Sequence, residues 1–99
     1  IAESSKPILQ RIAEILIDNP EGNLEVEGHS DTDGPEDINL DLSKSRAEAV
    51  MEFLISKGVD PSRISSVGYG ETRLKIDPEV TAQDRADNRR IEFRVVFGS

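Results

Sequence analysis

The chain has 99 residues, which is enough for one small domain with a single hydrophobic core. Its 20 acidic and 12 basic residues give a formal net charge of -8, so nucleic acid is not an expected partner, because phosphate binding needs a basic surface. The absence of cysteine excludes disulfides and thiolate metal sites, and no apolar run approaches the roughly 18 residues of a membrane span. We therefore expect one globular domain over residues 1–99 that does not itself insert into a membrane.

The first part of the chain predicts a helix followed by a strand. Residues 4–7 (Ser-Ser-Lys-Pro) are typical of a helix start, because hydroxyl groups cap the first turn and an early proline needs no donor. Apolar residues then recur at helical spacing, and residues 19–22 (Asn-Pro-Glu-Gly) end the helix. Residues 24–27 alternate apolar and acidic side chains, which predicts a strand with one covered face that ends at Gly28.

A second helix is predicted to begin between Pro35 and Leu42 and to end at Lys57. On a helical wheel, five apolar residues of this segment lie within about 100° of Arg46. They are Leu42, Ala47, Val50, Phe53 and Leu54. We therefore expect Arg46 to lie in or beside the apolar stripe, with its head partly buried. Such an arginine either extends its head to solvent, pairs with a structural carboxylate, or binds an anion, because a planar guanidinium matches a carboxylate.

The rest of the chain predicts two strands separated by a loop and a short helix. Residues 64–69 form a short strand, residues 71–80 a loop, and residues 81–88 a short polar helix. In residues 91–97 apolar and charged side chains alternate, which predicts a last strand with one half-buried face. The element order indicates an α+β fold in which a sheet packs on helices.

Charged residues at the ends of these elements suggest a ligand site. Asp31 follows the first strand, where open sheets often carry binding groups, although an Asx-turn or a helix cap is an alternative role. Asn39 lies on the same face as Arg46, and its alternative role is to cap the second helix. Arg89 and Arg90 precede the last strand, and strand alternation allows at most one of them to face the site. One carboxylate and two sources of guanidinium suit a zwitterion that carries both an ammonium and a carboxylate.

The sequence predicts no metal, no cofactor and no catalytic activity. Residues 31–34 begin like a calcium loop, but Pro35 and Glu36 occupy the positions that require an oxygen ligand and a glycine. His29 near Asp31 suggests a general base, yet the chain has no nucleophile elbow, no second histidine and no metal triad. We therefore expect His29 to be structural, or to form a wall of the pocket.

Taken together, the motifs resemble the OmpA-like (OmpA/MotB C-terminal) domain family. The likeness covers nearly all of the chain, with the motifs in the right order. They are residues 26–34, Asn39, residues 42–50, residues 58–60, residues 64–71 and residues 88–92. The resemblance implies a β/α/β/α/β sandwich whose mixed sheet packs on helices and whose last strand is antiparallel to the others.

The resemblance also implies a function. Members of the family bind peptidoglycan in the periplasm without catalysis, through the diaminopimelate of the stem peptide, and so anchor an outer-membrane protein, a lipoprotein or a motor stator to the wall. Asp31 matches the family residue that holds the ligand ammonium, and Arg46 matches the helix arginine that holds its carboxylate. Further positions match residues that help to line the pocket. They are Ser30, Asn39, Leu40 and Arg89.

The chain departs from the family pattern at its start. The family's first strand, an aromatic-rich run before the first helix, is missing, so we expect the sheet to lack an edge strand. Because residues 1–3 (Ile-Ala-Glu) open the chain without an initiator methionine, we expect it to be a domain of a longer protein. The acidic surface motivates an alternative function, in which an OmpA-like scaffold acts as a protein–protein interaction module with envelope proteins as partners.

Overall fold

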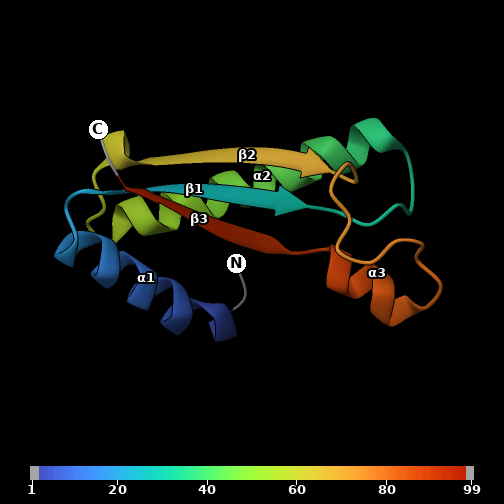
Figure 1. Cartoon of the computed structure of the whole chain (residues 1–99), viewed down its shortest axis with the longest axis horizontal. Coiled ribbons are helices and arrows are strands. Elements are labelled where there is room, and N and C mark those ends of the chain that lie inside the picture. Colours follow the sequence, from blue (N-terminus) through green and yellow to red (C-terminus); the bar gives the residue numbers. More distant parts are fainter. Residues whose placement is uncertain (1–2, 98–99) are drawn as a thin grey trace.

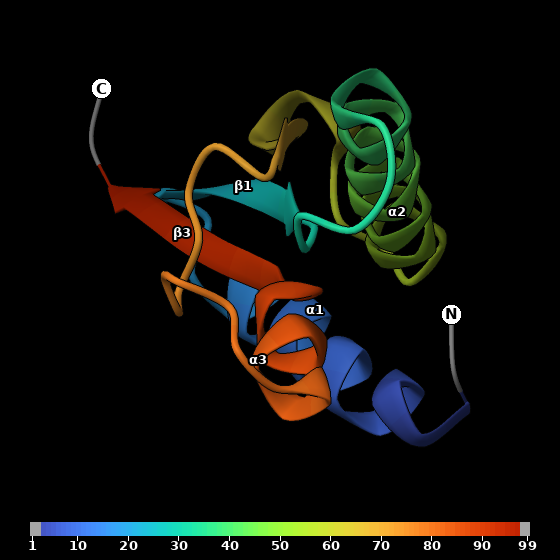
Figure 2. The same ribbon diagram turned by 90° about the vertical axis from the view of Figure 1, so that its right-hand side faces the viewer.

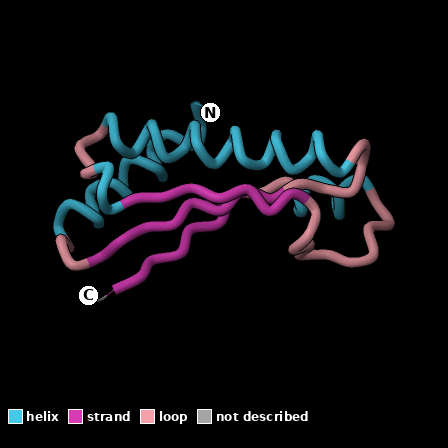
Figure 3. Tube along the Cα trace, turned by 90° about the horizontal axis from the view of Figure 1, so that it is seen from above, coloured by secondary structure: helices cyan, strands magenta, loops and turns pink. Residues whose placement is uncertain are grey.

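The computed structural model describes residues 3–97 as a three-stranded sheet with helices packed on one of its faces (Figures 1 and 3). In chain order the main elements are α1 (Lys6–Asp18), β1 (Gly22–His29), α2 (Glu36–Ser56), β2 (Ile64–Gly70), α3 (Ala82–Asn88) and β3 (Ile91–Phe97). Short 3-10 turns at Glu3–Ser5 and Pro61–Arg63 precede α1 and β2. In this part of the chain, none of the helices has the length and apolarity needed to cross a membrane.

The sheet is mixed, with the strand order β2-β1-β3. The central strand β1 is parallel to β2 and antiparallel to β3, so the expected α+β fold and the antiparallel last strand are both confirmed. Within residues 3–97 no strand precedes α1, and β3 is an edge of the sheet, as expected for a sheet that lacks the family's first strand.

The strand β3 is more exposed than the alternating pattern predicted. Phe93, Val95 and Phe97 are 36%, 48% and 62% exposed, whereas Ile91 packs against the core. The prediction of a half-buried face was therefore wrong for most of this strand. Alternation identifies the face of a strand that favours an apolar neighbour, but it does not show whether another element covers that face.

The orientation of α2 also differs from the helical wheel. Its buried residues are Asn39, Ser43, Ala47, Val50 and Leu54. These five define a stripe whose centre lies about 60° from Arg46 and about 100° from Leu42 at 100° per residue. Arg46 and Leu42 are both exposed, so the expectation that the Arg46 head is partly buried was wrong. The wheel failed because it counted Leu42 and Phe53 as part of the stripe, whereas Leu42 is exposed and Phe53 is only partly buried.

Glycines let the backbone of α2 approach the two parallel strands closely. Gly28 and Gly68 are register partners in β1 and β2. A Cβ atom on Gly28 would lie 2.0 Å from the carbonyl oxygen of Ser43, and one on Gly68 would lie 2.5 Å from the backbone nitrogen of Lys44. The Ser43 hydroxyl accepts a hydrogen bond from the backbone nitrogen of Gly70 at 2.9 Å. These contacts fix the first half of α2 across the ends of both strands.

We predict that Gly68→Ala lowers the free energy of unfolding by about 3 kcal/mol, at the upper end of the range for overpacked sites, because its Cβ would meet rigid helix backbone. Ser65→Ala, at an exposed position of the same strand, should change it by less than about 0.5 kcal/mol. Urea unfolding of both variants measures the difference. Equal stability of the two variants would show that α2 can shift away from the sheet at little cost.

Candidate functional site

The chain that leaves β1 is hydrogen-bonded to the ends of both neighbouring strands. The backbone nitrogen of His29 donates to the carbonyl of Arg90 at 2.9 Å, and that of Ser30 donates to the carbonyl of Gly70 at 2.8 Å. Ser30 is buried, and its hydroxyl donates to the carbonyl of Asp31 at 3.0 Å. Ser30 therefore fixes the backbone on which the Asp31 side chain is presented.

Asp31 is a buried carboxylate with both oxygens engaged. Its side chain is 8% exposed and forms an ion pair with Arg89, whose Nη1 donates to Oδ2. The other oxygen, Oδ1, accepts a hydrogen bond from the backbone nitrogen of Asp33 at 3.0 Å. The Asx-turn that we considered as an alternative role is therefore present, and it coexists with the ion pair. Together the two contacts fix the orientation of the carboxylate.

Asn39, in the first turns of α2, holds the same loop from the helix side. Its Nδ2 donates to the carbonyls of Asp31 at 3.3 Å and Asp33 at 3.0 Å. The alternative in which Asn39 caps α2 was wrong, because the N-cap residue is Pro35. The next residue, Leu40, is 44% exposed and lies beside the end of β2, where a Cβ on Gly70 would be 3.1 Å from the Leu40 Cα.

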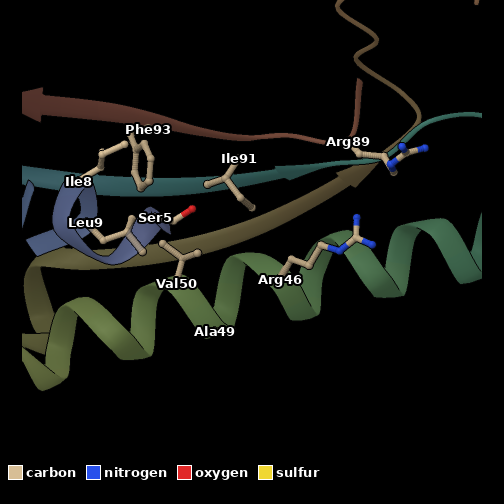
Figure 4. Close-up of a pocket in the computed structure, with 9 residues that line it drawn as sticks. All are labelled: Ser5, Ile8, Leu9, Arg46, Ala49, Val50, Arg89, Ile91 and Phe93. Carbon is tan, nitrogen blue, oxygen red and sulfur yellow. The ribbon is translucent and has the colours of Figure 1, made fainter. Parts of the chain in front are cut away.

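Arg46 and Arg89 line one cavity of about 610 Å³ between α1, α2 and β3. Figure 4 shows their guanidinium groups at one end of it, while apolar side chains such as Leu9, Val50 and Ile91 line the rest. Within residues 3–97, the Arg46 guanidinium has no hydrogen bond and no ion pair, so it is the cation left free to meet an anion.

Arg89 connects the two charged groups that the sequence singled out. It pairs with Asp31 and also lines the cavity with Arg46, whereas Asp31 is not among the residues that line the cavity. Arg90 points elsewhere, since its Nε pairs with Glu92. Of the two adjacent arginines only Arg89 lines the cavity, and the expectation that at most one of them faces the ligand site stays a prediction. A close approach of the Asp31 and Arg46 heads, within roughly 10 Å, stays a prediction.

Sequence reasoning missed two polar residues that brace this end of the sheet. Asn88, the last residue of α3, is fully buried, and Glu79 contacts the loop after Asp31 through Thr32. The Thr32 hydroxyl, which donates to the Glu79 carboxylate, lowers the pKa of Glu79. Asn88 could have been singled out from the sequence, because it stands next to Arg89 in the 88–92 motif. Nothing in the 71–80 loop distinguishes Glu79 from its neighbours.

His29 is enclosed beside three charged residues. It is 2% exposed, and its ring stacks on Tyr69 with centroids 5.4 Å apart. Its Nε2 lies 3.8 Å from Glu27 and 3.6 Å from Glu92, yet neither ring nitrogen has a hydrogen-bond partner among the described residues. Burial lowers the pKa of His29, and the charge of Arg90 lowers it further, although Glu92 acts in the opposite direction. This environment fits the structural role that the sequence suggested.

Comparison with known proteins agrees with this architecture. The sequence matches the OmpA family over residues 1–89. It is 44% identical to outer membrane porin F of Pseudomonas fluorescens over 88% of the chain, and 38% identical to peptidoglycan-binding protein ArfA of Mycobacterium tuberculosis over 89%. The crystal structure of the peptidoglycan-associated lipoprotein from Burkholderia pseudomallei superposes with a TM-score of 0.92 at 26% identity, covering 97% of this chain and 80% of that one.

The chain belongs to the OmpA family. It spans only about a quarter of the length of these two curated relatives, 26% of porin F and 27% of ArfA. The activities of the longer proteins therefore do not transfer to it as a whole.

We predict that His29 destabilises the fold as the pH falls. Folding lowers the pKa of His29. Below pH 6.5, about the pKa of histidine in the unfolded chain, the unfolded state therefore binds more protons than the folded state. The free energy of unfolding should fall by up to about 1.4 kcal/mol per pH unit below pH 6.5. His29→Phe keeps a ring against Tyr69 and should lack this slope, while the carboxylates away from His29, unlike Glu92, contribute equally to both proteins. Urea unfolding of both proteins between pH 7.5 and 5.5 measures how the free energy of unfolding depends on pH. The same dependence in wild type and His29→Phe would contradict the prediction.

Proposed function

We propose that this domain binds peptidoglycan without catalysis, through the diaminopimelate of the stem peptide. It would thereby anchor a longer envelope protein to the wall in the periplasm. The observation that carries the proposal is the unpaired Arg46 beside Arg89, which is itself paired with the buried Asp31. The names of two relatives, a peptidoglycan-binding protein and a peptidoglycan-associated lipoprotein, support the same class of ligand.

The charged groups divide the ligand between them. The side-chain end of diaminopimelate carries an ammonium and a carboxylate on one carbon, so it needs an anion and a cation close together. Asp31 accepts the ammonium, and Arg46 holds the carboxylate through its planar fork. Arg89 neutralises Asp31 in the free domain and turns its remaining donors toward the ligand carboxylate.

The uncharged site residues have supporting roles. Ser30 and Asn39 hold the backbone around Asp31 through the hydrogen bonds described above. Leu40 offers an exposed apolar surface next to the end of β2, where the stem peptide can lie. The proposal gives none of these residues a catalytic role, so it concerns binding alone.

The exposed face of β3 gives the alternative function a specific observation. Phe93, Val95 and Phe97 form an apolar surface on which another protein could pack. Co-sedimentation with purified sacculi separates the two functions. A domain that stays in the supernatant but captures an envelope protein in a pull-down would be an interaction module, whereas release of peptide or sugar from the sacculi would indicate a hydrolase.

We predict that the domain distinguishes diaminopimelate from lysine. A muropeptide with lysine keeps the side-chain ammonium but lacks the carboxylate that Arg46 would hold, and a charge-assisted contact is typically worth about 2 kcal/mol or more. Titration calorimetry should therefore show roughly 30-fold or greater preference for the diaminopimelate muropeptide. Equal affinity for the two muropeptides would show that Arg46 does not contact the ligand carboxylate. Absence of binding by both at millimolar concentration would reject the proposed function.

We predict that Arg46→Ala abolishes binding to sacculi and leaves the fold intact. Loss of this contact should cost about 2–5 kcal/mol of binding free energy, which raises a micromolar dissociation constant to between tens of micromolar and several millimolar. Because Arg46 is exposed and has no partner among residues 3–97, the free energy of unfolding should change by less than about 0.5 kcal/mol. Co-sedimentation and thermal melting of the same variant provide the two measurements.

Two further variants control this experiment. Arg11→Ala removes an exposed arginine of α1 that pairs with Glu14, and it should bind like the wild type. Arg46→Lys keeps the charge without the bidentate fork, so it should recover only part of the binding. A fall in stability of several kcal/mol together with normal binding would show that Arg46 is a structural residue.

A further inference from the structure

We propose that Glu79 and Asn88 form a strap that positions Asp31, and that ligand affinity depends on this strap. The inference rests on the proposed role of Asp31 as the acceptor of the ligand ammonium. It assigns a task to two residues that do not line the cavity of Arg46 and Arg89. Figure 2 shows where the strap lies, since α3 and the loop before it stand at the end of the sheet from which β1 runs on toward α2.

Asn88 is the fixed point of the strap. Its side chain is fully buried, and its Oδ1 accepts hydrogen bonds from the backbone nitrogens of Lys75 at 2.8 Å and Ile76 at 2.9 Å. Its Nδ2 donates to the carbonyl of Ile76 at 2.9 Å and to Oε2 of Glu79 at 2.6 Å. One amide side chain therefore joins the end of α3 to two separate points of the 71–80 loop.

Glu79 carries this connection across to the loop that follows β1. While Oε2 accepts from Asn88, Oε1 accepts from both the backbone nitrogen of Thr32, at 3.2 Å, and its hydroxyl. Thr32 is the residue directly after Asp31. A carboxylate with both oxygens bound to donors on two different segments is held in one orientation, and it restrains both segments.

The short helix α3 sets the spacing between the two ends of the strap. A capping box starts the helix, in which the Thr81 hydroxyl accepts from the backbone nitrogen of Asp84 and the Asp84 carboxylate accepts from that of Thr81. Glu79 lies just before the helix, and Asn88 is its last residue. Arg89 follows directly and pairs with Asp31. The end of α3 is therefore connected to the loop after β1 twice, through Glu79 and through Arg89.

The strap acts on the loop more than on the core. Its contacts to Thr32 are at the surface, and none of its residues belongs to the hydrophobic cluster formed by the helices and strands. Loss of the Glu79 carboxylate would leave the Asx-turn and the Asn39 contacts in place but free the backbone after Asp31 on one side. The Asp31 carboxylate would then sample more orientations, which lowers the affinity of a ligand that needs one of them.

The experiment compares Glu79→Ala with Glu71→Ala in the intact chain. Glu71 lies in the same loop, and its carboxylate has no hydrogen bond in the part of the chain that the structure describes. Hydrogen exchange of the Thr32 amide, measured by NMR without ligand, reports the strap directly. Titration with the diaminopimelate muropeptide reports its effect on binding.

We expect Glu79→Ala to speed exchange of the Thr32 amide about tenfold and to weaken muropeptide binding about 3- to 10-fold, with Glu71→Ala unchanged in both. Glu79→Gln should fall between wild type and Glu79→Ala, because its amide oxygen still accepts from Thr32 while its NH₂ faces the Asn88 donor. Adding Thr32→Val to Glu79→Ala should weaken binding no further, as required if both residues act through one contact.

Each outcome decides part of the proposal. Unchanged exchange in Glu79→Ala would overturn the strap, whatever the ligand does. Faster exchange with wild-type affinity would overturn its role in positioning Asp31. If the wild-type domain binds no muropeptide, the proposed function fails and the affinity claim fails with it, while the exchange rates still show whether Glu79 restrains the loop.

Discussion

The site depends on the direct contact between the backbone of α2 and the paired glycines of β1 and β2. Gly28 and Gly68 leave no room for side chains, so the helix lies against the two parallel strands at a fixed height and register. Ser43 locks this arrangement through its bond to Gly70. One side of the same helix is thereby brought to the strand ends, where Asn39 meets the loop after β1 and Arg46 meets the cavity.

The charged groups at this end belong to separate segments that meet only in the folded chain. The loop after β1 supplies Asp31, α2 supplies Arg46, and the end of α3 supplies Arg89. The overall charge of -8 does not predict a site with an unpaired guanidinium. The proposed recognition would therefore be a local property of the strand ends, where one ion pair satisfies two charges and leaves Arg46 available.

Sequence reasoning found the helices and strands, because periodicity is a local property, while the mixed sheet with its antiparallel last strand was predicted from the resemblance to the OmpA-like family. It failed where contacts between distant segments determine which side chains are buried or paired. The wheel counted Leu42 and Phe53 as buried, but Leu42 is exposed and Phe53 is only partly buried, so the packed face of α2 lies further from Arg46 than predicted. No local pattern indicated that Asn39 and Ser43 would be buried. The role of Glu79 was invisible for a related reason, since its partner Thr32 is 47 residues away and becomes a neighbour only through folding.

The open edge of β3 bears on the electrostatics of the cavity. Ile91 and Phe93 of this edge strand also line the cavity that holds Arg46 and Arg89 (Figure 4). An extended segment that paired with β3 would replace water along that wall of the cavity. The local dielectric constant would fall, and the attraction between Arg46 and a carboxylate would rise in proportion. The proposed attraction of Arg46 for a carboxylate would therefore depend partly on whether another segment pairs with β3.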